Sequence, residues 1–208
     1  MSTRPVPLLR RIGDAQRARG RHDDALAAYT EALAEHRRVE AETGETTRTL
    51  RDMQRVLTQL GETQRATGGL AEAIAHFTEA VTLAKRIRDD HSETPRALRD
   101  VTLALVRLGD ARREGGQVAA ALESYTEAAG LAQRIRDEYG ETATAQRDLC
   151  TAAMCAAAAS EQLGDTTAAL ALYWVARVAD TRLEYVFGPP FWDPEVSAEL
   201  AVAIAELS

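Results

Sequence analysis

A step of 48 residues recurs along this chain and constrains the fold more than any other feature of the sequence. Glycine, an aromatic residue, alanine and arginine each return at this step. The four columns are Gly20, Gly68, Gly116 and Gly164; Tyr29, Phe77, Tyr125 and Tyr173; Ala25, Ala73, Ala121 and Ala169; and Arg38, Arg86, Arg134 and Arg182. Because several independent columns agree on one period, we expect a tandem array of a single supersecondary unit.

Each unit reads as two helices separated by glycine. Residues 46–66 carry apolar side chains three or four positions apart, which is typical of one face of an α-helix. Gly68 and Gly69 interrupt the pattern, and residues 70–91 resume it. A threonine suited to helix capping precedes each new first helix, at Thr46, Thr94 and Thr142. The sequence therefore predicts hairpin repeats at about residues 6–45, 46–93, 94–141 and 142–188.

The repeat pattern stops at the Gly-Pro-Pro turn of residues 188–190. Asp193 followed by Pro194 is a good helix start, because aspartate caps and proline suits the first helical position. A short helix over residues 195–206 is expected to cover the last apolar face, as terminal caps of repeat arrays do. We therefore divide the chain into a repeat array, residues 1–188, and a C-terminal turn with a capping helix, residues 189–208.

The columns resemble those of the tetratricopeptide repeat (TPR) family. Small and large residues alternate in the family's order at Leu57, Leu60, Gly61, Gly68, Leu70, Ala73, Phe77 and Ala80, and the first and third units match in the same way. The resemblance implies an all-α solenoid of four helical hairpins. The usual repeat has 34 residues, so the longer step here implies helices of about 20 residues. The fourth unit departs from the pattern, with Ala153, Ala156 and Ala157 in place of larger residues and glycine.

In TPR arrays the first helix of each hairpin lines a concave face that binds partners. By this resemblance, the partner-binding positions are Arg10, Asp14, Arg17, Arg55, Thr58, Gln59, Glu62, Arg65, Val106, Arg107, Asp110, Arg113 and Met154.

Two charged ladders run through these positions. The acids Asp14, Glu62 and Asp110 are equivalent, and an arginine follows each acid after three residues. They form either a charged groove that recognises a charged peptide or helix, or a solvated face of self-paired charges. The arginines that recur in the second helices either reach the groove or bind carboxylates of a neighbouring repeat, such as Asp52, Asp100 and Asp148. We favour the carboxylates.

The first helix of the fourth repeat differs in kind. Residues 149–163 carry a single charge, Glu161, so this helix is expected to be covered on most sides. It packs against the third hairpin and the tail, or else Met154 and its neighbours form an apolar pocket for a partner helix. Phe191 and Trp192, after the rigid turn, are either part of the cap or a secondary interface.

Composition argues against several function classes. A net charge of −7 disfavours nonspecific binding to nucleic acid, which needs basic surface. The stretches of apolar residues are too short to cross a membrane, and the N-terminal sequence does not resemble a signal peptide. The four histidines match no metal-ligand spacing, and no phosphate-binding glycine loop follows a strand. We expect no enzyme activity, no cofactor and no metal, and a cytoplasmic location.

The sequence thus predicts a scaffold or adaptor that binds a peptide or helix of a partner protein in the groove. Long repeats with an Arg-Asp pair, as at Arg51-Asp52, are similar to arrays in bacterial signalling and defence proteins. The alternative is a self-associating, homodimeric module that uses the fourth repeat and the C-terminal tail.

Overall fold

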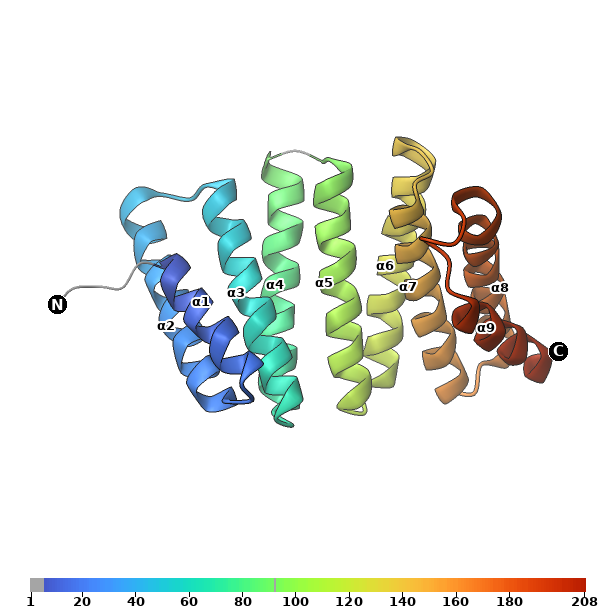
Figure 1. The fold of residues 1–208 in the computed structure, drawn as a ribbon, viewed down its shortest axis with the longest axis horizontal. Helices are drawn as coiled ribbons and strands as arrows, with labels where there is room; N and C mark the ends of the chain where they lie inside the picture. Colours follow the sequence, from blue (N-terminus) through green and yellow to red (C-terminus); the bar gives the residue numbers. More distant parts are fainter. Residues whose placement is uncertain (1–5, 92) are drawn as a thin grey trace. The chain divides into compact units, whose positions relative to one another are not determined.

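The computed structural model describes residues 6–91 and 93–208, and every regular element in these ranges is helical (Figure 1). The elements are α1 (Val6–Ala18), α2 (His22–Thr43), α3 (Thr47–Ala66), α4 (Leu70–His91), α5 (Pro95–Glu114), α6 (Val118–Tyr139), α7 (Ala143–Gln162), α8 (Thr166–Arg182), a π-helical turn η1 (Leu183–Phe187) and α9 (Pro194–Leu207). The prediction of an all-α helical-hairpin array is confirmed.

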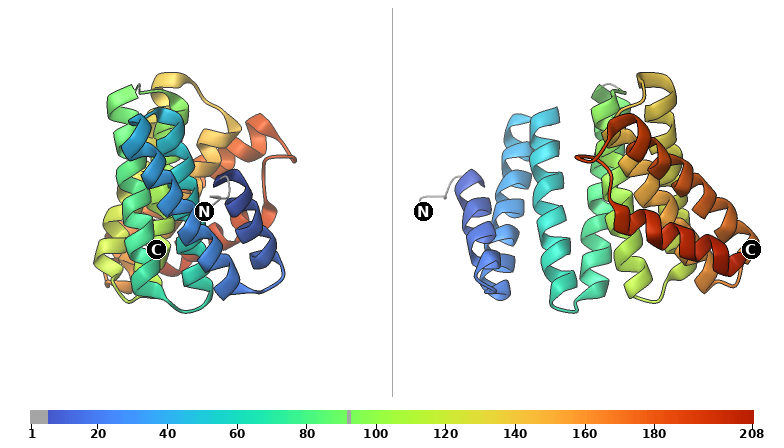
Figure 2. Two further views of the ribbon diagram at one scale, coloured as in Figure 1. Left: turned by 90° about the vertical axis from the view of Figure 1, so that its left-hand side faces the viewer. Right: turned by 45° about the vertical axis from the view of Figure 1, so that its right-hand side comes forward.

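The chain divides into two compact units, Met1–Glu93 and Thr94–Ser208. In the first unit, α1 pairs with α2, α3 pairs with α4, and α2 packs on α3. In the second unit, α5 pairs with α6 and α7 with α8, while α6 packs on α7 and α9 on α8. The C-terminal helix therefore lies against the last hairpin, as the right-hand view of Figure 2 shows.

Helix starts and turns follow local chemistry. Thr94 accepts a hydrogen bond from the backbone N–H of Ala97 at 3.1 Å, and Thr142 caps α7 in the same way. Within the hairpins, the tight turn needs a left-handed residue, and Gly164 has φ 81°. The N–H of Asp165 then reaches back to the carbonyl of Ser160 at 3.0 Å, which satisfies a carbonyl that the helix leaves free.

Each hairpin closes by packing a ring against a small residue. A methyl group built on Gly109 would lie 2.5 Å from the ring of Tyr125, so only glycine leaves room for this approach. Gly13 meets Tyr29 and Gly61 meets Phe77 in the same way. The fourth hairpin has Ala157 at the equivalent position, opposite Tyr173, and both residues are buried.

Candidate functional site

Two of the predicted groove acids bond to tyrosines of their own hairpins. The hydroxyl of Tyr29 donates to Asp14 Oδ1 at 2.7 Å, and that of Tyr125 donates to Asp110 Oδ1 at 2.8 Å. Burial, followed by this hydrogen bond, raises the pKa of both phenols, so they stay neutral donors. Asp14 and Asp110 therefore help to close their hairpins as well as facing the surface.

The second repeat has Phe77 instead of tyrosine, so its acid, Glu62, has no tyrosine hydroxyl to bind and makes a different contact. Glu62 Oε2 accepts from Arg17 Nη1 at 2.7 Å, which joins α3 to α1 of the preceding repeat. Asp14 pairs with Arg10 at 3.3 Å. Arg17 thus pairs with the acid of the next repeat, and not with the acid three residues before it.

The remaining groove positions of the first unit are mostly engaged within α3. Arg55 pairs with Asp52 at 3.1 Å, and the Thr58 hydroxyl donates to the carbonyl of Gln54 at 2.9 Å. Gln59 and Arg65 are half-buried on the same helix. These side chains belong to one ordered charged face, and the first unit brings them together along α1 and α3.

In the second unit, the first-helix face runs from α5 onto α7. Val106 packs with Cys155 against the cluster around Tyr125. A hydrogen bond with Tyr125 raises the pKa of Arg113, and Arg107 donates to the carbonyl of Leu103 at 3.2 Å. We call Val106, Arg107, Asp110, Arg113, Thr151, Met154 and Cys155 the α5–α7 face. Asp110 and Arg113 are close enough to Cys155 to influence the pKa of its thiol, so the two helices present one surface.

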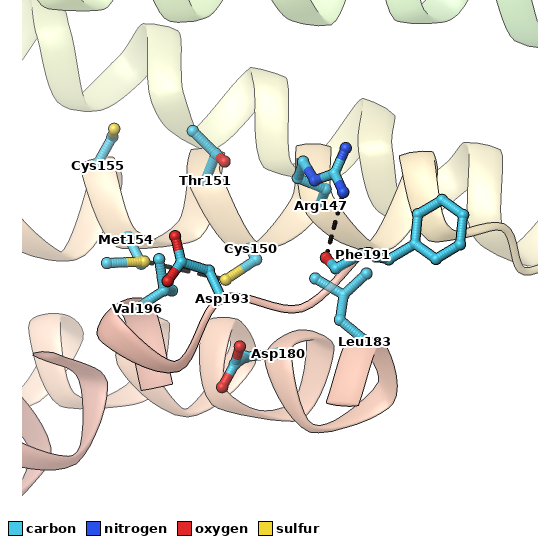
Figure 3. Close-up of a pocket in the computed structure, with 10 residues that line it drawn as sticks. All are labelled: Arg147, Cys150, Thr151, Met154, Cys155, Asp180, Leu183, Phe191, Asp193 and Val196. Carbon is cyan, nitrogen blue, oxygen red and sulfur yellow. Dashed lines mark hydrogen bonds between the residues drawn. The ribbon is translucent and has the colours of Figure 1, made fainter. Parts of the chain in front are cut away.

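A pocket of about 340 Å³ opens beside this face (Figure 3). Its lining is mainly apolar and comes from α7, from the end of α8, from η1 and from the tail. Met154 and Cys150 form one wall, while Leu183 and Val196 face them in the close-up. The lining residues are Arg147, Cys150, Thr151, Met154, Cys155, Asp180, Leu183, Phe191, Asp193 and Val196.

One end of the pocket shows why the tail lies where it does. Arg99 on α5 donates through Nε and Nη2 to Asp148 on α7, at 2.5 and 3.2 Å. Arg147 is the equivalent arginine one repeat later, and the residue equivalent to Asp148 is Val196. Arg147 instead donates to the carbonyl oxygen of Phe191 at 3.2 Å (Figure 3). The tail therefore accepts the hydrogen bond that a following repeat's acid would accept.

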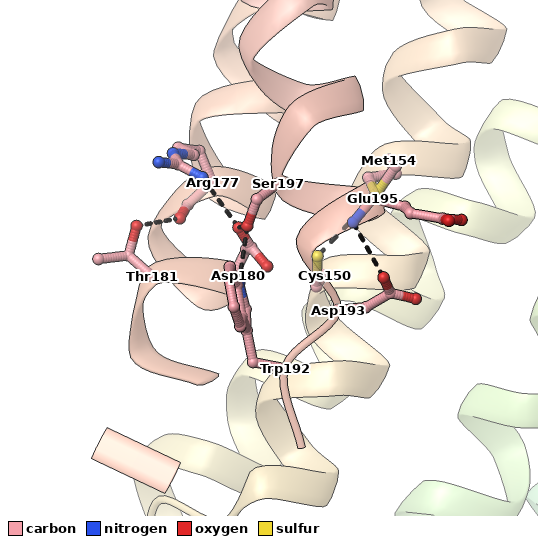
Figure 4. Close-up of polar contacts among 9 residues, drawn as sticks. All are labelled: Cys150, Met154, Arg177, Asp180, Thr181, Trp192, Asp193, Glu195 and Ser197. Atoms are coloured by element: carbon pink, nitrogen blue, oxygen red, sulfur yellow. Dashed lines mark hydrogen bonds and ion pairs between the residues drawn. The ribbon is translucent and has the colours of Figure 1, made fainter. Parts of the chain in front are cut away.

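A polar network around the buried Asp180 fixes the other side of the tail (Figure 4). The Ser197 hydroxyl donates to Asp180 Oδ2 at 2.5 Å, and Arg177 donates to the same oxygen at 2.9 Å. The indole N–H of Trp192 donates to Ser197 Oγ at 2.7 Å. Trp192 is thus used inside the chain, while Phe191 remains 43% exposed.

Comparison with known proteins agrees with this architecture. Residues 103–142, which include most of α5 and all of α6, match the family model of the tetratricopeptide repeat. The chain has the fold of a TPR-like array.

Solved structures share the fold at low sequence identity. BtubC (BKLC) from P. vanneervenii is 13% identical, with a TM-score of 0.72 over 97% of this chain and 71% of that one. A putative kinesin light chain with TPR-like repeats from Podospora anserina is 15% identical, with a TM-score of 0.68 over 99% and 87%. Yeast histone chaperone Hif1, described as a scaffold protein that recruits protein complexes to core histones, is 12% identical, with a TM-score of 0.63 over 97% and 94%. No curated protein matches the sequence.

The arginine column of the TPR second helices binds carboxylates, but mostly not the predicted ones. Arg182 donates to both oxygens of Glu141 at 2.7 and 2.6 Å, and Arg86 pairs with Glu45. Glu141 and Glu45 lie in the loop before the first helix of the same hairpin, whereas Asp148 forms its ion pair with Arg99. The prediction of Asp148 as a partner is therefore wrong, because the loop acid lies nearer to the end of the second helix.

Neither of the two thiols that line the pocket, Cys150 and Cys155, is an activated nucleophile. Burial raises the pKa of Cys150 to about 12 and that of Cys155 to about 11, so both remain protonated near neutral pH. The Cys150 sulfur lies 3.9 Å from the Met154 sulfur. Within residues 6–91 and 93–208, no group of three or more His, Cys, Asp and Glu side chains is placed to hold a metal ion. No helix in these ranges is long and apolar enough to span a bilayer.

Sequence reasoning missed most of the pocket. It named Met154 and Phe191 but not Asp180, Leu183 or Val196, because these become neighbours only when the tail returns to α7. One indication was present: Asp180 stands in a column that has His36 in the first hairpin and alanine, Ala84 and Ala132, in the second and third. An acid at a buried alanine position requires a partner, and here the partners come from α8 and α9.

Proposed function

We propose that this TPR array is a non-catalytic scaffold that binds a segment of a partner protein on the α5–α7 face, with one apolar side chain of that segment in the pocket. The observation that carries the proposal is the pocket itself, an apolar cavity that opens beside Met154. Its volume of about 340 Å³ lies in the range of small ligand sites, and mainly apolar walls with a few polar groups are typical of such sites.

The charges on the α5–α7 face favour an acidic partner segment. Arg107 and Arg113 stand on α5, and the intervening acid, Asp110, already accepts a hydrogen bond from Tyr125. A carboxylate on the partner would find the guanidinium of Arg113 near Cys155, which lines the pocket. We therefore expect a segment that combines a bulky apolar anchor with one or more acidic residues.

The first unit extends this proposal. The predicted contacts for a partner in this unit remain Arg10, Asp14, Arg17, Arg55, Thr58, Gln59, Glu62 and Arg65. Arg17 and Glu62 pair with each other at 2.7 Å, so a partner would meet them as an ion pair. The resemblance of the long repeats to bacterial signalling and defence arrays supports a role in a system of that kind. Two free cysteines, both with raised thiol pKa, suit a reducing cytoplasm.

A displayed library of random twelve-residue peptides, selected against the full chain, tests the binding mode. Met154→Glu places a charge in the pocket wall and should weaken the selected peptides at least about tenfold. Leu163→Glu is the matched control, because Leu163 is exposed at the end of α7 and does not line the pocket. Arg113→Glu should select against acidic peptides while helicity is unchanged.

Equal binding by the wild type and Met154→Glu would place the partner elsewhere and remove the pocket from the proposal. If the selected peptides bind through Met154 but carry no acidic residue, the pocket remains part of the proposal and the preference for an acidic segment is refuted.

A further inference from the structure

The outward face of α8 is apolar, unlike the other second helices of this chain. Trp174 is 53% exposed and Val178 is 56% exposed, with Val175 beside them. Tyr185, 77% exposed, and Val186 continue the apolar surface into η1. We call these five residues the α8 stripe. At the positions of Trp174 and Val175, the three preceding repeats have a Thr-Glu pair, at Thr30-Glu31, Thr78-Glu79 and Thr126-Glu127.

The fold of the hairpin does not account for this change. α8 packs into its hairpin through Ala169, Tyr173, Ala176 and Ala179, which lie on the other side of the helix. At 100° per residue, the pocket-lining Asp180 and Leu183 also lie roughly opposite Val178. The stripe therefore belongs neither to the core nor to the candidate peptide site. It exposes on the order of 500 Å² of apolar surface, a size at which patches on soluble proteins are often functional.

We propose that the α8 stripe is the two-fold interface between two copies of this chain. In an isologous contact, if one residue of the first copy touches a second residue of the other copy, the reverse contact is made as well, because the two copies are related by a two-fold axis. With the axis at Val178 and the helices antiparallel, the two Val178 side chains meet, and Trp174 of one copy lies against Arg182 of the other. Apolar residues at 171, 174, 175 and 178 follow the three- and four-residue spacing by which helices pack along a seam.

The charge of Arg182 fits this arrangement. Its Nε and Nη2 atoms, on one edge of the guanidinium, bond to Glu141 of the same chain. This leaves the planar face of the group available, and Arg182 remains 48% exposed. Arginine stacks on tryptophan by a cation–π contact without giving up hydrogen bonds at its edge. The interface is thus complementary to itself in this cation–π contact as well as in its apolar character.

A shallow depression beside the stripe gives the second copy further surface. It has a volume of about 290 Å³ and lies between α6 and α8, with Gln133 and Arg136 on one side and Trp174, Val175 and Val178 on the other. A standard interface takes about 800 Å² from each partner, and the stripe alone supplies somewhat less. When the surface of this depression is included, the contact area suits a weak, concentration-dependent dimer.

Sedimentation equilibrium of the full chain over a concentration series tests the proposal. We expect the average mass to rise from 22.6 kDa toward twice that value. The double variant Trp174→Thr with Val175→Glu restores the pair that the other repeats carry, so it should fold, and it should weaken the dimer at least about tenfold. Val202→Glu, at an exposed position on α9, is the control and should leave the dimer unchanged. Circular dichroism confirms the fold of each variant.

A cysteine cross-link tests the position of the axis. Val178→Cys should form a disulfide-linked dimer under mild oxidation, because the axis brings the two side chains together, whereas Val202→Cys should not. A wild-type chain that remains monomeric at millimolar concentration, or a dimer that the Thr-Glu variant leaves intact, would overturn the proposal. In the first case the stripe is the docking site of a different protein.

Discussion

The third and fourth TPR hairpins share one backbone plan and differ in what their columns are used for. In the third, Gly109 lets the Tyr125 ring approach α5, and the hydroxyl bonds to Asp110. In the fourth, alanine replaces this glycine, and the Tyr173 hydroxyl donates to Glu161 at 2.5 Å, one turn further along α7. The same ring thus closes both hairpins with a different acid, which shows that the polar contact adapts to the packing.

The two hairpins keep some columns and change others. The buried alanines Ala121, Ala128, Ala169 and Ala176 are kept, because close packing leaves no room for a larger side chain. The exposed Thr-Glu pair becomes Trp-Val, and the buried Ala132 becomes Asp180, which helps to hold the tail. The difference suggests that new function in this array is concentrated in the fourth hairpin.

The largest expected effect comes from transferring the buried acid to the third hairpin. Ala132 is fully buried and is the equivalent of Asp180, but its surroundings have Ala129 and Leu149 where the fourth hairpin has Arg177 and Ser197. Ala132→Asp should therefore lower the free energy of unfolding by about 4 kcal/mol, the cost of an unpaired buried charge. Urea unfolding followed by circular dichroism measures it. A loss below about 1 kcal/mol would mean that the third hairpin supplies partners of its own.

The tail network in the fourth hairpin should come next. Asp180→Ala removes the acceptor of Ser197 and Arg177, so unfolding should become easier by about 2 kcal/mol. The emission of Trp192 should shift to longer wavelength as the tail loosens, because its indole is half-buried against Ser197. Trp174→Phe in the background leaves Trp192 as the reporter. An unchanged emission spectrum would argue that α9 is held by apolar contacts alone.

Two glycines of the third hairpin should respond to alanine with opposite signs. Gly109→Ala places a methyl group against the Tyr125 ring and should destabilise by about 1.5 kcal/mol. Gly130→Ala, in α6 with open space around it, should stabilise by about 0.8 kcal/mol through helix propensity. Thermal unfolding of both variants compares them directly. Two shifts of the same sign would show that the ring moves aside easily.

Removing the tyrosine hydroxyl should have a smaller effect. Tyr125→Phe deletes the 2.8 Å bond to Asp110 and recreates the Phe77 of the second hairpin, so the loss should be about 1 kcal/mol. Tyr173→Phe tests the same bond in the fourth hairpin, where the acceptor is Glu161. If the two losses differ by a wide margin, the acids are not interchangeable in the way that the comparison implies.

Alkaline pH should affect the fourth hairpin through a group that the third lacks. Burial raises the pKa of Cys150 from 9.0 to about 12, and the equivalent residue in the third hairpin is Thr102. Above pH 9 the unfolded chain loses this proton while the folded chain keeps it, so stability falls as the pH rises. The loss is about 1 kcal/mol at pH 10. Cys150→Ala should reduce the difference in unfolding free energy between pH 8 and pH 10 by this amount; an identical difference would contradict the shift.

The parts of this structure that sequence could predict are those fixed by neighbours in the chain. Thr94 and Thr142 were predicted as caps because a hydroxyl and an N–H three residues later lie within one turn. The partner of Asp110 was not predictable in this way, since Tyr125 comes close only through the hairpin. The pocket was harder still, because it depends on Phe191 and Val196 meeting α7, and these lie beyond the last repeat, where the columns give no guide.

The hydrogen bond from Arg147 to the backbone of Phe191 has a consequence for how such stacks are lengthened. α9 begins at Pro194, three residues later than a fifth first helix would begin, and Val196 stands where the fourth hairpin has Asp148. A peptide carbonyl satisfies the guanidinium there but offers no charge. This position therefore lacks the ion pair by which a further repeat would pack on the fourth. An engineer who wished to graft additional modules would first restore an aspartate at 196 and free the arginine from the main chain.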